Sequence, residues 1–196
     1  TRANLEAAVA EQAAAESADT VVVFLAGHGE QGGGEQGGGK PGETRRYYFL
    51  PTDIAGRTIA EAGRGRNLID WEKIQGPVTR ALGRRLLFVD ACQAGQTQAG
   101  PAYNERLLGD ARAERFTVFS ATSPDQLAEE HPAIGHGYFT YALVEGLKGK
   151  ALDPRERAVR TYSLGNYLTS EVRAMSSGRQ EPEFYSGHGD IVLVRK

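Results

Sequence analysis

The sequence has only one cysteine in its 196 residues, so no disulfide can form within the chain. A lone thiol fits a reducing compartment, and we expect a cytoplasmic location. No apolar run approaches the roughly 18 residues that a membrane-spanning helix needs, and no secretory signal is visible. We therefore expect no membrane partner. A single cysteine is more often a small buried side chain than a nucleophile, so its surroundings have to decide between the two.

Charge of one sign is not in excess either. The chain has 23 Lys and Arg against 25 Asp and Glu, a formal net charge of −2. Nucleic-acid-binding domains usually carry a basic patch, so we expect no nucleic-acid partner. The cysteine and the four histidines show no Cys-x-x-Cys or His-x-x-x-His spacing, so we expect no metal site and no required cofactor. Hydrophobic residues make up 40% of the chain, which is enough for one domain, residues 1–196, with its own core.

Short apolar runs alternate along the chain with amphipathic segments. The runs predict strands at residues 20–26, 46–50, 86–90, 116–120 and 191–194. The amphipathic segments predict helices at residues 3–17, 68–82 and 138–147, and a further helix that begins near Ser163. The run at 20–26 is continuous and rich in β-branched residues, which is typical of a strand buried on both faces. Strands that alternate with helices predict an α/β fold with a mostly parallel central sheet flanked by helices.

Two segments lack such patterns. Residues 30–44 are rich in glycine and predict a mobile loop, because such a segment buries too little surface to offset its ordering entropy. Residues 93–115 are polar and charged, and we expect a second long loop there.

Two strands of the predicted sheet lead into residues that carry chemistry. His28 follows the run at 20–26, and Cys92 follows the run at 86–90. Functional groups gather where strands of an open α/β sheet end, so a histidine and a cysteine can meet there. A nearby imidazole activates a thiol as a nucleophile. We predict Cys92 as the nucleophile and His28 as its base, with the N–H groups of Gly29 and Cys92 as the oxyanion hole.

Other histidines compete for this role. Gly-His-Gly occurs three times, around His28, His136 and His188. His136 precedes a helical pattern and His188 precedes the last predicted strand, so either fits a plain turn. Only His28 follows a long apolar strand and precedes the cysteine, so it is the preferred base.

The sequence around these two residues resembles the superfamily of caspases, metacaspases and paracaspases, most closely its bacterial metacaspase-like members. The resemblance rests on GHG at residues 27–29 and DACQAG at residues 90–95, each after an apolar strand. Cys92 follows His28 by 64 residues, against about 50 in caspases, and the glycine-rich insert accounts for the difference. FSATSPDQLAE at 119–129 and GYFTYALVEGL at 137–147 extend the resemblance over most of the chain.

This resemblance implies a caspase-like fold and a cysteine endopeptidase that uses a Cys-His dyad. Asp90 stands where metacaspases and paracaspases have the aspartate that selects Arg or Lys at P1, so it implies protein or peptide substrates with a basic P1 residue. Asp125 is a second candidate for the same pocket. The family's domain begins with a strand and a helix before the position of Thr1, and we expect an upstream segment or a partner chain to supply them.

Several alternatives stay open. A caspase-fold scaffold that binds partners without turnover is the runner-up, and the presence of both His28 and Cys92 argues against it. Many metacaspases are activated by calcium, but this sequence has no EF-hand loop and no assignable calcium ligands. Self-processing is a further hypothesis, because several arginines lie in or beside the predicted loops: Arg45, Arg46, Arg106, Arg112 and Arg115.

Overall fold

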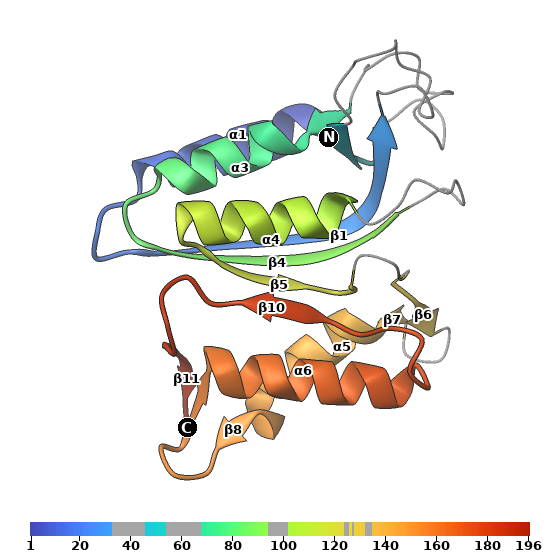
Figure 1. The fold of residues 1–196 in the computed structure, drawn as a ribbon. Coiled ribbons are helices and arrows are strands. Elements are labelled where there is room, and N and C mark those ends of the chain that lie inside the picture. The colour runs from blue at the N-terminus through green and yellow to red at the C-terminus, as the bar shows by residue number, and fades with distance from the viewer. Residues whose placement is uncertain (33–45, 54–67, 94–101, 124–125, 127, 132–134) are drawn as a thin grey trace.

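A six-stranded sheet runs through the chain, with helices on both faces (Figure 1). This computed structural model describes residues 1–32, 46–53, 68–93, 102–123, 126, 128–131 and 135–196. The strands of the sheet are β1 (Thr20–Gly32), β2 (Arg46–Leu50), β3 (Ile69–Asp70), β4 (Arg84–Gln93), β5 (Thr117–Ser120) and β10 (Glu183–Tyr185). Their spatial order is β10-β5-β4-β1-β2-β3.

The middle of the sheet is parallel. The long strands β1 and β4 pair in parallel, and β5 continues the parallel pairing on the other side of β4. The short strands β2, β3 and β10 pair antiparallel toward the two ends of the sheet. The predicted α/β fold with a mostly parallel central sheet is confirmed, and β1 and β4 lie side by side at its centre.

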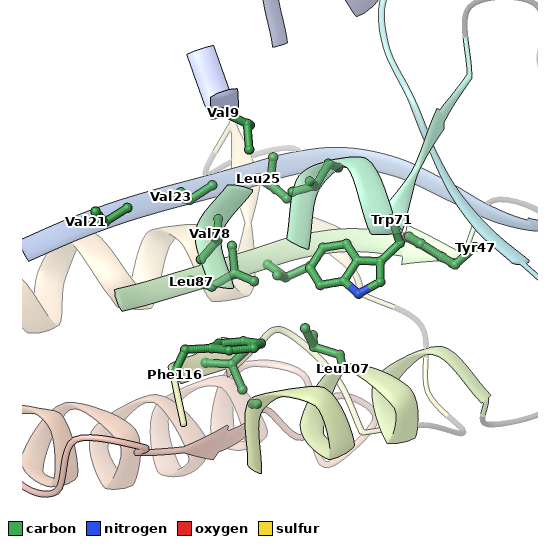
Figure 2. Close-up of a cluster of buried hydrophobic side chains, with 14 of the residues drawn as sticks. Val9, Val21, Val23, Leu25, Tyr47, Trp71, Val78, Leu87, Leu107 and Phe116 are labelled. Atoms are coloured by element: carbon green, nitrogen blue, oxygen red, sulfur yellow. The ribbon is translucent and has the colours of Figure 1, made fainter. Parts of the chain in front are cut away.

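Helices cover the two faces of the sheet as separate layers. One face carries α1 (Arg2–Glu11), α3 (Trp71–Arg80) and α4 (Ala102–Glu114), and the other carries α5 (Tyr138–Glu145) and α6 (Thr161–Met175) (Figure 1). The first layer buries the alternate residues Val21, Val23 and Leu25 of β1 against Trp71 and Leu107 (Figure 2). The second layer buries Phe88 and Phe119 against α5 and α6. The sheet is therefore held between two apolar cores.

Several smaller elements lie outside the six-stranded sheet and the five helices that cover it. The helix α1 continues into a short turn, η1 (Gln12–Ala14), and α5 continues into η3 (Gly146–Lys150). A three-stranded sheet contains β8 (Leu152–Asp153), β9 (Ala158–Arg160) and β11 (Val192–Arg195). The strands β6 (Glu130–His131) and β7 (His136–Gly137) pair antiparallel. The predicted strand at 191–194 therefore exists, but it belongs to the small sheet.

The prediction of a long loop at residues 93–115 is wrong. Gln93 is the last residue of β4, and residues 102–114 form the helix α4. Leu107, Leu108 and Ala111 give this helix a buried stripe at helical spacing, which its many charged residues hide in the sequence. Three of the arginines considered for self-processing belong to α4 or follow it directly: Arg106, Arg112 and Arg115. Arg106 and Arg112 therefore lie in a helix, and Arg115 lies in the turn between α4 and β5.

The predicted loop at residues 30–44 is wrong for its first three residues. Residues 30–32 belong to β1, because β2 pairs with β1 from His28 to Gly32. The rest of the predicted loop, residues 33–44, lies outside the described residues, as does Arg45. The strand β1 thus extends well past the apolar run that predicted it.

The strand β1 is not buried on both faces as expected. Val22 is 57% exposed and Phe24 is 45% exposed. Their register partners on β4, Leu86 and Phe88, are covered by the layer of α5 and α6. That layer lies over β4, β5 and β10, so one face of β1 remains uncovered among the described residues. Within the same residues, no helix combines the length and apolar character needed to cross a membrane.

Candidate active site

The register between β1 and β4 brings the two predicted catalytic residues opposite each other. His28 is the Cα partner of Cys92, and Ala26 is the partner of Asp90. Neighbouring strands lie about 4.8 Å apart, so the backbones of His28 and Cys92 are adjacent. Both residues lie inside their strands and not beyond the strand ends. The strand β1 continues past His28 because β2 pairs with it there, and β4 continues past Cys92 to Gln93. The sequence predicted the meeting of the two residues, and the structure places it within the sheet.

The glycines on either side of His28 make room for the side chains of β2. Gly27 has a φ of +153°, and a Cβ there would lie 2.9 Å from Cζ of Phe49. Gly29 is more restricted, because its Cβ would lie 1.4 Å from Oη of the buried Tyr47. The Gly-His-Gly motif is therefore required by the packing of Phe49 and Tyr47 across the backbone that carries His28.

We expect Gly29→Ala to destabilise the protein by about 1–3 kcal/mol through overpacking against Tyr47. Gly109→Ala is the matched control, because Gly109 is exposed within α4 and a Cβ there meets nothing within 4 Å. Alanine in an exposed helix stabilises by about 1 kcal/mol relative to glycine. Thermal unfolding of both variants checks this prediction, and equal melting temperatures would contradict it.

A pocket of about 360 Å³ opens beside His28. Its lining comes from four parts of the chain: residues 24 and 26–28 of β1, Asp90 of β4, residues 128–130, and the stretch from Gly135 to Thr140. The polar groups that face it include His28, Asp90, Glu130 and His136. The pocket therefore joins a candidate base to acidic residues that include Asp90 and Glu130, a combination that suits a cationic ligand.

Asp90 lies at the buried side of this pocket. Burial raises the pKa of Asp90, hydrogen bonds from Thr140 lower it, and the charge of Glu130 raises it further. The Thr140 hydroxyl donates to Oδ2 of Asp90. A Cβ at Gly137 would lie 3.2 Å from the same oxygen, so a side chain there would crowd the carboxylate. Asp90 is thus a desolvated acid that gains most from a cation placed beside it.

Some lining residues were not foreseen from the sequence. Glu130 and His136 come from the short pair of strands β6 and β7, in which Glu130 is the partner of Gly137. Thr140 lies in the first turn of α5, whose helical period was visible while its contact with Asp90 was not. Asp125, the second residue predicted for the pocket, lies outside the described residues.

The third Gly-His-Gly motif has a structural role away from the pocket. Nε2 of His188 accepts a hydrogen bond from the backbone N–H of Arg85, at 3.1 Å. Burial lowers the pKa of His188, and the positive charges of Arg85, Arg84 and Arg115 lower it further. The neutral imidazole therefore ties the turn before β11 to the start of β4.

This contact predicts a loss of stability in acid. The folded-state pKa of His188 lies below its ordinary value of 6.5, so its contribution is present above that value and is lost as the pH falls toward the lowered pKa. The melting temperature of wild type should drop more between about pH 7 and pH 5 than that of His188→Gln, whose amide oxygen can still accept from Arg85. Parallel curves for the two proteins would refute the assignment.

The sheet order and the two helical layers define an α/β protein of the three-layer class. A family model described as the caspase domain matches residues 1–190. The chain therefore belongs to the caspase-domain family, which at the level of the family is a group of cysteine-peptidase-type hydrolases.

A solved structure shares the fold. The crystal structure of a protein from Geobacter sulfurreducens, a structural-genomics target, is similar to this chain with a TM-score of 0.60 and 15% sequence identity. The match covers 94% of this chain and 72% of that one. A comparison with curated proteins gives no match. At this identity the structural likeness supports the fold alone.

Proposed function

We propose that this protein is a cysteine endopeptidase that cleaves peptide bonds after Arg or Lys. The observation that carries the proposal is the register of β1 and β4, which sets His28 opposite Cys92 and two residues from the partner of Asp90. His28 and Asp90 line the same pocket. The proposed base, nucleophile and cation-binding acid thus come from two adjacent strands.

In the proposed reaction, the sulfur of Cys92 attacks the scissile carbonyl carbon and a thioester forms through a tetrahedral intermediate. His28 takes the thiol proton and delivers it to the leaving amine nitrogen as the C–N bond breaks. Water then attacks the thioester, which releases the new carboxylate and restores the thiol. The N–H groups of Gly29 and Cys92 are the proposed donors to the oxyanion.

The pocket supplies the proposed specificity. Asp90 is half-buried, and its carboxylate pairs with a guanidinium or ammonium group at P1. Glu130 adds a second negative charge on the exposed side of the pocket. Asp125 stays a prediction for this pocket. Because burial raises the pKa of Asp90, binding of a cation at P1 is linked to proton release, and KM for basic substrates should rise as the pH is lowered.

Fluorogenic peptides that differ only at P1 test this proposal. Wild type and Cys92→Ala are assayed with Arg, Lys or Asp at P1, with and without calcium. We expect turnover of the Arg and Lys peptides by wild type only. Turnover after Asp alone would keep the enzyme class and overturn the role of Asp90. No turnover under any condition would favour the scaffold function, and calcium-dependent turnover would add an activator.

We further propose that an upstream strand completes the sheet beside β1. Among the described residues, residues 20–27 pair only with β4, because β2 pairs with β1 from His28 onward. The exposed Val22 and Phe24 lie on this stretch. Hydrogen exchange of residues 20–27, measured with and without the upstream segment, tests the proposal. Equal protection in both would count against it.

Self-processing stays a prediction. Because Arg106 and Arg112 belong to α4, cleavage after either of them requires local unfolding of a helix whose stripe is buried. Arg115 lies in the turn after this helix. Mass spectrometry of the purified chain beside Cys92→Ala decides whether any cleavage depends on the cysteine.

A further inference from the structure

Gln180, in the turn between α6 and β10, is a polar side chain with 0% exposure. Its Nε2 donates to the carbonyl of Ala121 at 2.9 Å, and its Oε1 accepts from the N–H of Glu129 at 2.9 Å. Its own backbone is held by the buried Ser176, whose Oγ accepts from the Gln180 N–H at 3.0 Å. The side-chain amide of Gln180 therefore bridges two backbone segments, one at Ala121 and one at Glu129.

Glu129 lies in the wall of the pocket, and Ala121 is hydrogen-bonded to the strand that carries Asp90 at the pocket floor. On the floor side, the N–H of Ala121 donates to the carbonyl of Val89 at 2.9 Å, and Val89 precedes Asp90. On the wall side, the carbonyl of Glu129 accepts from the N–H of Tyr138 at 3.1 Å, at the start of α5.

These hydrogen bonds and the chain segments between them form a closed ring that includes Asp90. Thr140, two residues beyond Tyr138 on α5, donates its hydroxyl to Asp90. The ring thus runs from Asp90 through Val89, Ala121, Gln180, Glu129 and Tyr138 to Thr140 and back to Asp90. Gln180 is the one side chain of the ring that comes from outside the pocket.

We propose that Gln180 is a positioning residue for the specificity of the pocket: it fixes the wall at residues 128–130 against the floor that carries Asp90. The inference rests on the proposed function, because it concerns recognition of the P1 cation. The carbonyl of the buried Ala121 and the N–H of the half-buried Glu129 both depend on Gln180, and the loss of a partner at the buried carbonyl leaves a desolvated polar group unsatisfied.

Two neighbouring contacts also hold the chain near the pocket wall, and we expect each to contribute less than the hydrogen bonds of Gln180. Arg179 donates from Nε and Nη2 to the two carboxylate oxygens of Glu129, at 2.7 and 2.8 Å. Its side chain is mostly exposed, and exposed ion pairs contribute little. The N–H of Glu181 donates to Oε1 of Gln126 at 2.5 Å. We therefore expect the loss of the Gln180 bridge to have the largest effect on the position of the pocket wall.

Gln180→Met tests the proposal, because methionine keeps the approximate length of the side chain and removes both hydrogen bonds. We expect KM for Arg-P1 peptides to rise about tenfold with a smaller change in kcat. The affinity for agmatine, a free guanidinium probe, should fall by a similar factor. Alkylation of Cys92 by iodoacetamide should proceed at the wild-type rate, and Cys92 is the only thiol in the chain. Hydrogen exchange at the Glu129 amide should speed up.

Two further variants separate positioning from general stability. Val172→Ala removes volume from the buried face of α6 without touching the ring. It should lower the melting temperature and leave KM near the wild-type value. Gln180→Glu can keep both hydrogen bonds while its carboxyl is protonated, so its KM, relative to wild type at each pH, should recover as the pH falls.

The outcomes distinguish the inference from the proposed function. Faster exchange at Glu129 with unchanged KM and unchanged agmatine affinity would overturn the positioning role, as would an equal rise of KM in Val172→Ala. If wild type cleaves no peptide, the proposed function fails, and the agmatine affinities of wild type and Gln180→Met still decide the inference. A wild type that neither cleaves nor binds agmatine would overturn both.

Discussion

Asp90→Asn is expected to abolish cleavage after Arg and Lys and to raise the melting temperature of the protein. The loss of activity follows from the removal of the half-buried charge that pairs with the P1 cation and is covered by it on binding. Removal of one partner from a buried ion pair costs about 3–5 kcal/mol, which corresponds to a loss in kcat/KM of about a hundredfold or more. The Thr140 hydroxyl can still donate to the side-chain oxygen of asparagine, so the pocket keeps its shape.

The gain in stability follows from the pKa of Asp90 in the unoccupied pocket. Burial raises this pKa above its ordinary value of 3.8, so the folded state holds its proton more tightly than the unfolded chain does. Ionised Asp90 therefore destabilises the fold, and wild-type stability falls as the pH rises from 3.8 through the raised pKa. The advantage of Asp90→Asn should vanish near about pH 3 and be largest at neutral pH.

Glu130→Gln is the matched control for both effects. It removes the same unit of charge from the same pocket, but Glu130 is exposed. We expect a smaller rise of KM and little change in the melting temperature. Activity assays and thermal unfolding across pH check the pair of variants. Efficient cleavage after Arg by Asp90→Asn would rule out the pocket assignment.

His28→Ala is expected to lower kcat by about a hundredfold to ten-thousandfold, the range found when a general acid or base is removed. KM for the Arg-P1 peptide should change much less, because His28 acts on the scissile bond and Asp90 on the P1 side chain. The register of β1 and β4 places His28, and no other described histidine, opposite Cys92.

His136→Ala separates this role from a general effect on the pocket. His136 lines the same pocket from β7, and its loss should alter KM more than kcat. Steady-state kinetics of both variants, beside iodoacetamide alkylation of Cys92, check the prediction. If His136→Ala lost kcat and His28→Ala kept it, the assignment of the base would be reversed.

The centre of the fold could be predicted because its signals are local. The continuous apolar runs at 20–26 and 86–90 predict strands of the central sheet, and residues toward the carboxyl ends of such neighbouring strands are expected to lie close together. The register of His28 with Cys92 refines that expectation. The helical stripe of α5 was visible for the same reason, because Phe139 and Leu143 recur at helical spacing.

Features that depend on tertiary contacts could not be predicted. The helix α4 carries many charges, and its stripe of Leu107, Leu108 and Ala111 gains meaning only against the sheet. The exposure of Val22 and Phe24 depends on which helices cover β1. Gln180 looks like any surface glutamine in the sequence, because its partners at Ala121 and Glu129 lie more than 50 residues away.

A covalent label directed by arginine tests the central claim most directly. A peptidyl chloromethyl ketone with Arg at P1 is incubated with wild type, Cys92→Ala and Asp90→Asn, and the adducts are located by mass spectrometry. We predict one adduct on Cys92 of wild type, none on Cys92→Ala, and strongly slowed labelling of Asp90→Asn, while a matched Asp reagent labels poorly. Equal labelling by both reagents, or no adduct on a Cys92 that iodoacetamide still alkylates, would contradict a cysteine peptidase specific for basic P1 residues.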